Sequence, residues 1–190
     1  MSVVEITDPL APSYIANLPT ATAPSLWRDI KVIGDYAFIG SEAGMHGMQI
    51  LDLTQVLDLS GFPFNITATS NYLGFGNAHN LAANPETNYV YGVGTNTFGG
   101  GLHIVDVSNP EAPFLAGSYD GAYSHDVQPV IYNGLDTDYQ WQEIVFCFNG
   151  QNGVDIVIVS YIHLRAHETR HVIVCRILHA KYQFYSLIPL

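Results

Sequence analysis

Short apolar runs, separated by clusters of Gly, Pro, Asn and Asp, cover most of the chain. In "LHIVDVSNP" (102–110), β-branched positions alternate with other residues, and the run ends at Ser108-Asn109-Pro110. This pattern predicts a strand closed by a turn, because proline has no N–H for a strand ladder and Asn tolerates tight turns. Stretches with helical periodicity are no longer than a turn or two. The pattern therefore predicts an all-β chain of short strands joined as antiparallel meanders.

The same phrase occurs four times, as "SVVEITDPLAP" (2–12), "GMQILDLT" (47–54), "GLHIVDVSNPEAP" (101–113) and "GVDIVIVS" (153–160). A column of acids runs through the first three copies: Glu5, Asp52 and Asp106. We expect these acids to accept backbone N–H groups in the turn after the strand. A period of roughly 50 residues indicates a solenoid, a propeller or an array.

Two further columns repeat with the phrase. A polar pair precedes an aliphatic residue in each unit, as Arg28-Asp29-Ile30, His79-Asn80-Leu81 and His125-Asp126-Val127. A middle strand follows in each unit, over 35–41, 88–94 and 143–150. Three or four strands per period favour a propeller blade over a helical repeat. We expect the aromatic residues of the middle strands to pack between blades: Tyr36, Phe38, Tyr89, Tyr91, Phe146 and Phe148.

These motifs resemble a known family. "GLHIVDVSNPEAP" resembles the LVIVD repeat, and the order of motifs over roughly residues 2–157 is similar to the choice-of-anchor B family of surface proteins. The resemblance implies a β-propeller that is exported to the cell surface or secreted. It implies no established chemistry.

We therefore expect an all-β fold: a partial β-propeller of antiparallel meander sheets, with about three blades plus one extra strand. The LVIVD-type propeller fragment would span 1–157, with units at about 20–60, 72–118 and 119–157, and with 2–12 as the last strand of a preceding blade. Propellers close with typically four to eight blades, and the chain begins inside a strand without a signal peptide. We therefore expect a piece of a longer protein.

Residues 158–190 form a different kind of sequence. "HLRAHETRH" spaces His163, His167 and His171 at i, i+4 and i+8, which is a spacing that zinc sites use on a helix. However, "VSYIHLRAHET" (159–169) and "IVCRIL" (173–178) resemble translated sequencing-adapter read-through. We expect a non-native tail, and we exclude its histidines and Cys175 from the candidate site.

The charge distribution changes at the same boundary. Residues 1–157 hold two basic and 16 acidic residues, whereas 158–190 hold four basic residues and one acidic residue. An acidic repeat region repels phosphate backbones, so we expect no nucleic-acid partner. No apolar run is long enough to span a membrane. Cys147 lies in a predicted strand and is expected to be a small buried hydrophobic residue.

The first strand of a propeller blade lies innermost, so the polar pairs should converge at the central channel. This channel column comprises Arg28, Asp29, His79, Asn80, His125 and Asp126. Its side chains can tie blades together through hydrogen bonds, or they can hold a polar ligand or a divalent cation such as calcium. The sequence assigns no catalytic residue and no definite metal ligand.

We expect a non-catalytic extracellular or cell-surface module for binding or adhesion, with an extracellular protein or glycan as its partner. The alternative is an enzyme, such as a metal-assisted hydrolase, with its site at the channel mouth, because a fold does not fix a function.

Overall fold

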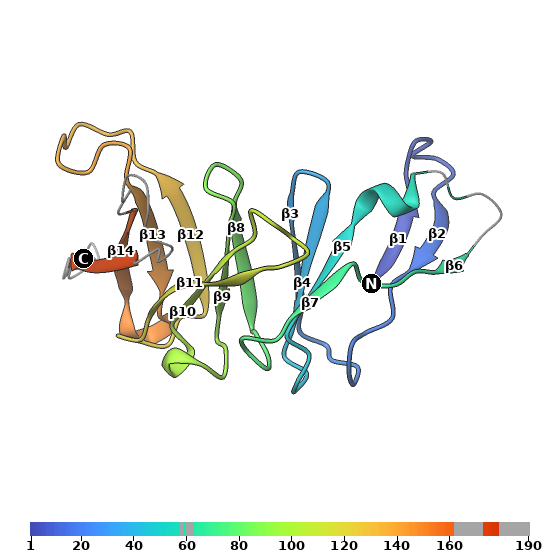
Figure 1. Ribbon diagram of the computed structural model, residues 1–190, viewed down its shortest axis with the longest axis horizontal. Coiled ribbons are helices and arrows are strands. Elements are labelled where there is room, and N and C mark those ends of the chain that lie inside the picture. Colours follow the sequence, from blue (N-terminus) through green and yellow to red (C-terminus); the bar gives the residue numbers. More distant parts are fainter. Residues whose placement is uncertain (58, 60–62, 162–172, 179–190) are drawn as a thin grey trace, which may run out of the picture.

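The computed structural model describes residues 1–57, 59, 63–161 and 173–178, and it is built almost entirely from antiparallel sheets. Its described helices are three short 3-10 turns, at Leu53–Val56, Phe98–Gly100 and Gly150–Asn152. No helix in this part of the chain is long and apolar enough to cross a membrane. The all-β prediction is confirmed, and the sheets follow one another across the molecule in chain order (Figure 1).

Three four-stranded sheets form the blades. Blade 1 consists of β3 (Arg28–Ile33), β4 (Tyr36–Ser41), β5 (Met48–Asp52) and β7 (Ser70–Tyr72). Blade 2 consists of β8 (Asn80–Asn84), β9 (Tyr89–Val93), β10 (Leu102–Asp106) and β11 (Phe114–Tyr119). Blade 3 consists of β12 (Asp126–Ile131), β13 (Glu143–Phe148), β14 (Val154–Tyr161) and β15 (Ile173–Leu178). In each blade the strands pair antiparallel in chain order, as a meander requires.

A smaller N-terminal sheet precedes blade 1. It consists of β1 (Ser2–Glu5), β2 (Ser13–Asn17) and β6 (Phe64–Asn65). β6 comes from the connection between β5 and β7 and pairs parallel with β2. The connection within blade 1 therefore reaches across to the neighbouring sheet. The blade itself extends to Tyr72, beyond the expected unit boundary near residue 60.

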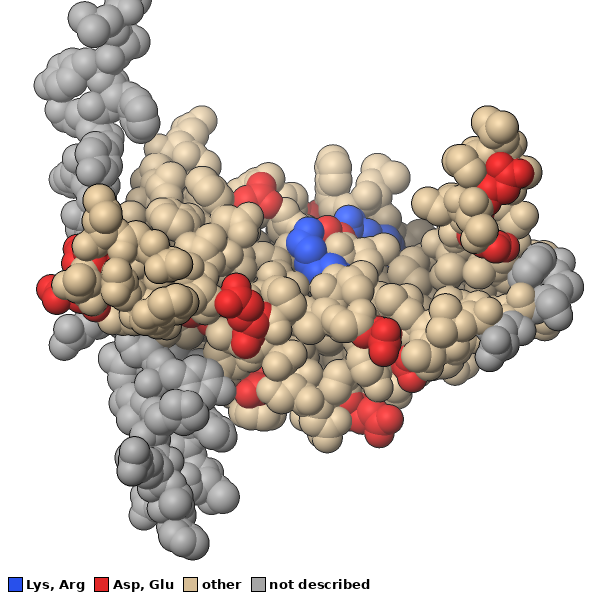
Figure 2. Space-filling view, turned by 90° about the horizontal axis from the view of Figure 1, so that it is seen from above, with Lys and Arg blue, Asp and Glu red and all other residues tan. Residues whose placement is uncertain are grey.

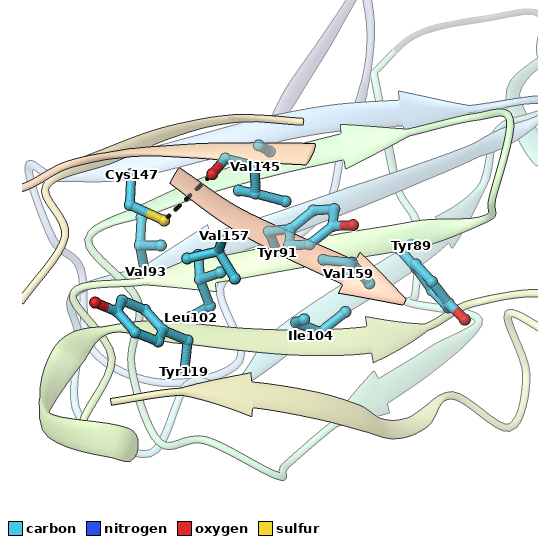
Figure 3. Close-up of a cluster of buried hydrophobic side chains, with 11 residues drawn as sticks. Tyr89, Tyr91, Val93, Leu102, Ile104, Tyr119, Val145, Cys147, Val157 and Val159 are labelled. Atoms are coloured by element: carbon cyan, nitrogen blue, oxygen red, sulfur yellow. Dashed lines mark hydrogen bonds between the residues drawn. The ribbon is translucent and has the colours of Figure 1, made fainter. Parts of the chain in front are cut away.

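Alternating side chains bury both faces of β4 and β9, the middle strands of blades 1 and 2. Tyr89, Tyr91 and Val93 of β9 pack toward blade 3, whereas Val90 packs toward blade 1. The cluster between blades 2 and 3 also takes Val145 and neighbouring residues (Figure 3). A second cluster lies between blades 1 and 2, and a third lies between the N-terminal sheet and blade 1. Each fully buried aliphatic or aromatic side chain contributes roughly 1.5–3 kcal/mol to folding, so the blades are stabilised by contact with their neighbours.

The aromatic prediction is confirmed in part. Phe38, Tyr89 and Tyr91 are buried between blades, but Phe148 is 42% exposed. The prediction failed there because Val145 and Cys147 occupy the β13 face toward blade 2. Alternation then points Phe146 and Phe148 to the opposite face of blade 3, where no other described sheet packs.

Two of the three acids in the acidic column accept a backbone N–H in the turn after the strand, as predicted. Asp52 Oδ1 accepts the N–H of Thr54 at 2.9 Å, and Asp106 Oδ1 accepts the N–H of Ser108 at 2.8 Å. Glu5 differs, since its carboxylate accepts the Thr7 hydroxyl at 3.0 Å. Its longer side chain does not form the short local ring that Asp makes with the backbone two residues ahead.

Candidate functional site at the inner strands

The first strands of the three blades lie side by side, with β8 in contact with both β3 and β12. The channel column occupies the beginnings of these strands, so its members from successive blades come close together. Viewed from above, the Lys and Arg side chains in sight gather at a hollow in the middle of the molecule, whereas Asp and Glu are scattered over it (Figure 2). Polar side chains of the inner strands connect blade 1 to blade 2 and blade 2 to blade 3.

Arg28 turns back toward its own approach loop. One guanidinium nitrogen donates to Thr20 Oγ1 at 2.6 Å and to the carbonyl of Ala23 at 3.4 Å. The other lies 3.5 Å from His46 Nε2. These contacts assign Arg28 to the packing of the segment that leads into β3.

Asp29 links blade 1 to blade 2. Its Oδ2 accepts the backbone N–H of Leu81 in β8 at 3.0 Å, while its Oδ1 accepts the N–H of Ile30 at 2.8 Å. Lys31 adds an ion pair at 2.8 Å, although its ammonium group is partly exposed. A carboxylate that accepts backbone N–H groups from two blades is a structural tie, of the kind expected for one role of the column.

The equivalent pair in blade 2 makes contact with blade 3. Asn80 donates from Nδ2 to Asp126 Oδ1, and its own Oδ1 accepts the N–H of Leu81 at 2.9 Å. His79 and His125 meet one another, with their Nε2 atoms 2.9 Å apart and their ring centroids 4.2 Å apart. The structure thus brings together His79, Asn80, His125 and Asp126. Whether the column holds a ligand stays a prediction.

The sequence analysis did not identify Glu42 as part of this site. Glu42 lies just after β4 in blade 1, and its carboxylate accepts the Nδ1–H of His79. On the other side, Asp126 Oδ2 accepts the Nδ1–H of His125 at 2.9 Å. Each imidazole of the pair is therefore oriented by its own carboxylate. Glu42 directly follows the predicted middle strand, so the sequence shows an acid at that position. Its pairing with His79 depends on how blades 1 and 2 pack and is not visible in the sequence.

Two further histidines are buried away from the pair. His103, on β10, is 1% exposed, and the Tyr72 hydroxyl and Thr97 hydroxyl lie 2.7 Å and 2.8 Å from its two ring nitrogens. Burial lowers the pKa of His103 to about 4 and raises that of Tyr72 to about 12. A neutral imidazole accepts from Tyr72 on one nitrogen and donates to Thr97 from the other, which satisfies both groups. This is a blade 1 to blade 2 tie.

His46 is fully buried, and one ring nitrogen lies 3.1 Å from the Gly47 carbonyl. Burial lowers the pKa of His46, and the nearby Arg28 charge lowers it further. His46 and His103 thus belong to the packed interior. The sequence analysis did not assign either of them to the channel column.

A buried carboxyl joins blades 2 and 3 at the other end of the inner strands. Glu143 on β13 is 4% exposed, and its Oε1 accepts from Asn84 Nδ2 at 2.5 Å and from the Thr87 hydroxyl at 3.2 Å. Burial raises the pKa of Glu143, and this effect outweighs the opposing influence of hydrogen bonds from Tyr91, Asn84 and Thr87.

The described residues contain no cluster of three or more His, Cys, Asp and Glu side chains arranged to hold a metal ion. The three histidines of the zinc-like spacing, His163, His167 and His171, lie outside the described residues. Cys147 is confirmed as a buried residue within the core between blades 2 and 3. The origin of residues 158–190 stays a prediction.

The chain contains LVIVD repeats, since the model of the LVIVD repeat family matches residues 27–53 and 76–121. The first match covers β3, β4 and β5, and the second runs from the approach to β8 to the end of β11. The matches are consistent with a propeller-like fold and suggest a repeat module of the cell-surface type. No curated protein and no solved structure matches the chain.

Proposed function

We propose that the chain is a non-catalytic module that binds an extracellular or cell-surface partner through one edge of its blades. This lower edge is defined by the loops that precede each first strand and those that join each second and third strand: 20–27, 42–47, 73–79, 94–101, 120–125 and 149–153. These loops lie at the same end of the sheets, because the strands of a meander alternate in direction (Figure 1).

The observation that carries the proposal is the set of exposed apolar side chains on this edge. Trp27, Met45, Leu73 and Tyr123 are 59%, 82%, 71% and 47% exposed. Together they come from the loops of blade 1, the approach to blade 2 and the approach to blade 3. Aromatic residues and Met are enriched in protein interfaces, and exposed apolar side chains grouped on one side of a molecule mark interaction surfaces.

Backbone hydrogen bonds hold these loops against one another. Glu42 N–H donates to the Trp27 carbonyl at 3.2 Å, and Ala78 N–H donates to the Ser41 carbonyl at 2.8 Å. Ser124 N–H donates to the Gly100 carbonyl at 3.1 Å. An edge fixed in this way loses little conformational entropy on binding, which favours affinity.

A protein surface is the favoured partner. Four large apolar side chains on the lower edge are exposed to water, and the apolar surface of a protein partner would bury them together. The secreted or surface location is part of the same proposal and is supported by the LVIVD repeats. The choice-of-anchor B family is the finer assignment that we propose. A glycan partner, stacking on Trp27 and Tyr123, is the competing outcome.

The test is binding of the purified chain to an array of extracellular proteins and an array of glycans, repeated with Trp27→Ala/Tyr123→Ala. We expect a protein signal that falls at least tenfold in the double variant, because interface aromatics commonly contribute about 2 kcal/mol or more. Trp141→Ala is the matched control. Trp141 is 71% exposed but lies in the β12–β13 connection, at the opposite end of the sheets.

The proposal would be wrong if both arrays gave no saturable signal. It would also be wrong if Trp141→Ala reduced binding as much as the double variant. A signal confined to glycans would replace the protein partner with a carbohydrate one.

A further inference from the structure

His79 and His125 face each other in a way that two neutral imidazole rings do not explain. Their Nε2 atoms are 2.9 Å apart. Each Nδ1 is directed at a carboxylate, Glu42 for His79 and Asp126 for His125, so each Nδ1 carries the hydrogen. A neutral imidazole has a hydrogen on one nitrogen and a lone pair on the other. The two Nε2 lone pairs therefore lie close together on inclined rings, and they repel unless a cation lies beside them.

We propose that the Nε2 atoms of His79 and His125 bind a divalent transition-metal cation of the Zn²⁺ type. A histidine that ligates a metal almost always donates its other N–H to a carboxylate, carbonyl or water, which fixes the ring and raises its basicity. Both imidazoles have such a carboxylate. Two Zn–N bonds of about 2.0–2.1 Å span the 2.9 Å between the Nε2 atoms at an N–Zn–N angle of about 90°, so a tetrahedral ion would move the two nitrogens apart by a few tenths of an ångström.

The donor chemistry selects the kind of metal. Imidazole nitrogen suits Zn²⁺, Cu²⁺ and Ni²⁺, whereas Ca²⁺ takes oxygen ligands. Two carboxylates next to the pair compensate the charge of a divalent ion, and Asn80 Nδ2 holds Asp126 in place. The described residues supply no larger cluster of metal-binding side chains, so the remaining coordination positions would belong to water or to an incoming ligand.

The site would connect three blades. Glu42 comes from blade 1, His79 from the start of blade 2, and His125 and Asp126 from the start of blade 3. A metal bound there would bridge blades 2 and 3 directly through His79 and His125. Glu42 of blade 1 would orient the His79 ring through its hydrogen bond to Nδ1. This inference goes beyond the proposed partner binding, because it concerns the inner strands and not the apolar residues of the lower edge.

The test is calorimetric titration of the full chain with ZnCl₂ at pH 7.5. All proteins carry His163→Ala, His167→Ala, His171→Ala, His179→Ala and Cys175→Ser, so that no histidine or cysteine of the tail competes for the metal. We expect binding of one Zn²⁺ per chain. His79→Ala should abolish it, and Glu42→Gln should weaken it about 10–100-fold, as loss of an outer carboxylate does. The matched control is Glu86→Gln, which removes an exposed acid at the opposite end of blade 2 and should leave the affinity unchanged.

A second measurement does not depend on the folding of a variant. Cu²⁺ added to the same chain with His79 and His125 intact should give an electron paramagnetic resonance spectrum with nitrogen hyperfine structure from two imidazoles. Absence of Zn²⁺ binding, or binding that survives in His79→Ala, would overturn the proposal. A Cu²⁺ spectrum without nitrogen coupling would do the same. In those cases, a proton shared by the two Nε2 atoms would account for their short separation.

Discussion

The buried imidazole of His103 predicts a specific loss of stability in acid. Its pKa is about 4 in the folded chain, against 6.5 for an exposed histidine. Between pH 4 and pH 6.5, His103 is therefore protonated in the unfolded chain and neutral in the folded chain. A group of this kind contributes its full stability above pH 6.5 and loses it progressively as the pH falls toward 4.

The size of the effect follows from the two pKa values. Linkage between protonation and folding gives a loss of about 2 kcal/mol at pH 5 and about 3 kcal/mol at pH 4, relative to neutral pH. His103 is 1% exposed and contacts Phe75 and Phe98, with ring centroids 5.1 Å and 5.2 Å away. Solvent therefore screens the charge little, and an imidazolium there loses the hydrogen bond that it accepts from Tyr72.

The assay is urea unfolding followed by far-ultraviolet circular dichroism at pH 7, 5 and 4, for the parent chain and for His103→Gln. Glutamine keeps a donor and an acceptor but does not titrate in this range. We expect the fall in unfolding free energy from pH 7 to pH 4 to be about 3 kcal/mol smaller in the variant than in the parent. His46 also has a lowered pKa, but it is present in both proteins and cancels in the comparison.

Equal pH dependence in the two proteins would refute this reasoning. A direct check that does not need the variant is the imidazole chemical shift of His103 by NMR, which should stay constant from pH 8 to pH 5. A midpoint near 6.5 would show that the ring titrates like an exposed histidine and that burial between blades 1 and 2 does not control it.

Three further changes test contacts between blades or within one blade. Asp29→Ala should lower the unfolding free energy by about 1 kcal/mol, because the N–H of Leu81 loses its charged acceptor but keeps Asn80 Oδ1. The melting temperature of Glu143→Gln, relative to that of the parent, should rise as the pH rises through the raised pKa of Glu143. The raised pKa of Glu143 means that stability is present at low pH and is lost as the pH rises through that pKa, whereas Gln does not titrate. Gly47→Ala should be destabilising by more than about 1 kcal/mol, because φ is +65° and a Cβ would come within 2.3 Å of a backbone oxygen.

The Asp29 and Gly47 substitutions each have a matched control variant. Asp35→Ala removes an exposed acid from the β3–β4 turn and should change stability by less than about 0.5 kcal/mol. Gly150→Ala has a similar φ of +62° with no atom within 4 Å of the added Cβ, so it isolates the backbone cost. Comparable losses in Gly47→Ala and Gly150→Ala would contradict the steric argument. A melting temperature of Glu143→Gln that varies with pH as in the parent would contradict the buried-carboxyl argument.

Features that depend on nearby residues were predictable from the sequence. The turns at Asp52 and Asp106 follow from a carboxylate and an N–H two residues apart, and their repetition identified the blades. The column at the inner strands was also predictable, because equivalent positions of a repeat must lie near each other.

Features that depend on the fit of one blade against the next were not predictable. The contact of Glu42 with His79 joins residues 37 positions apart in two sheets, and only the packed register places them together. The exposure of Phe148 has a related reason. Phe148 pairs with Asp126 as Val93 pairs with Asn80, so it lies on the equivalent face of its strand, but no other described sheet covers that face of blade 3.

The ties along the inner strands have a direction. Asp29 reaches forward from blade 1 to Leu81 of blade 2, and Asn80 reaches forward from blade 2 to Asp126 of blade 3. In the language of symmetry this is a heterologous contact, in which the two surfaces that meet are different. Such contacts generate a closed ring when the rotation per unit divides the circle, and an open chain of molecules when it does not. Blade 2 therefore meets its two neighbours through unlike groups: the backbone N–H of Leu81 donates to Asp29 of blade 1, whereas the side-chain amide of Asn80 donates to Asp126 of blade 3.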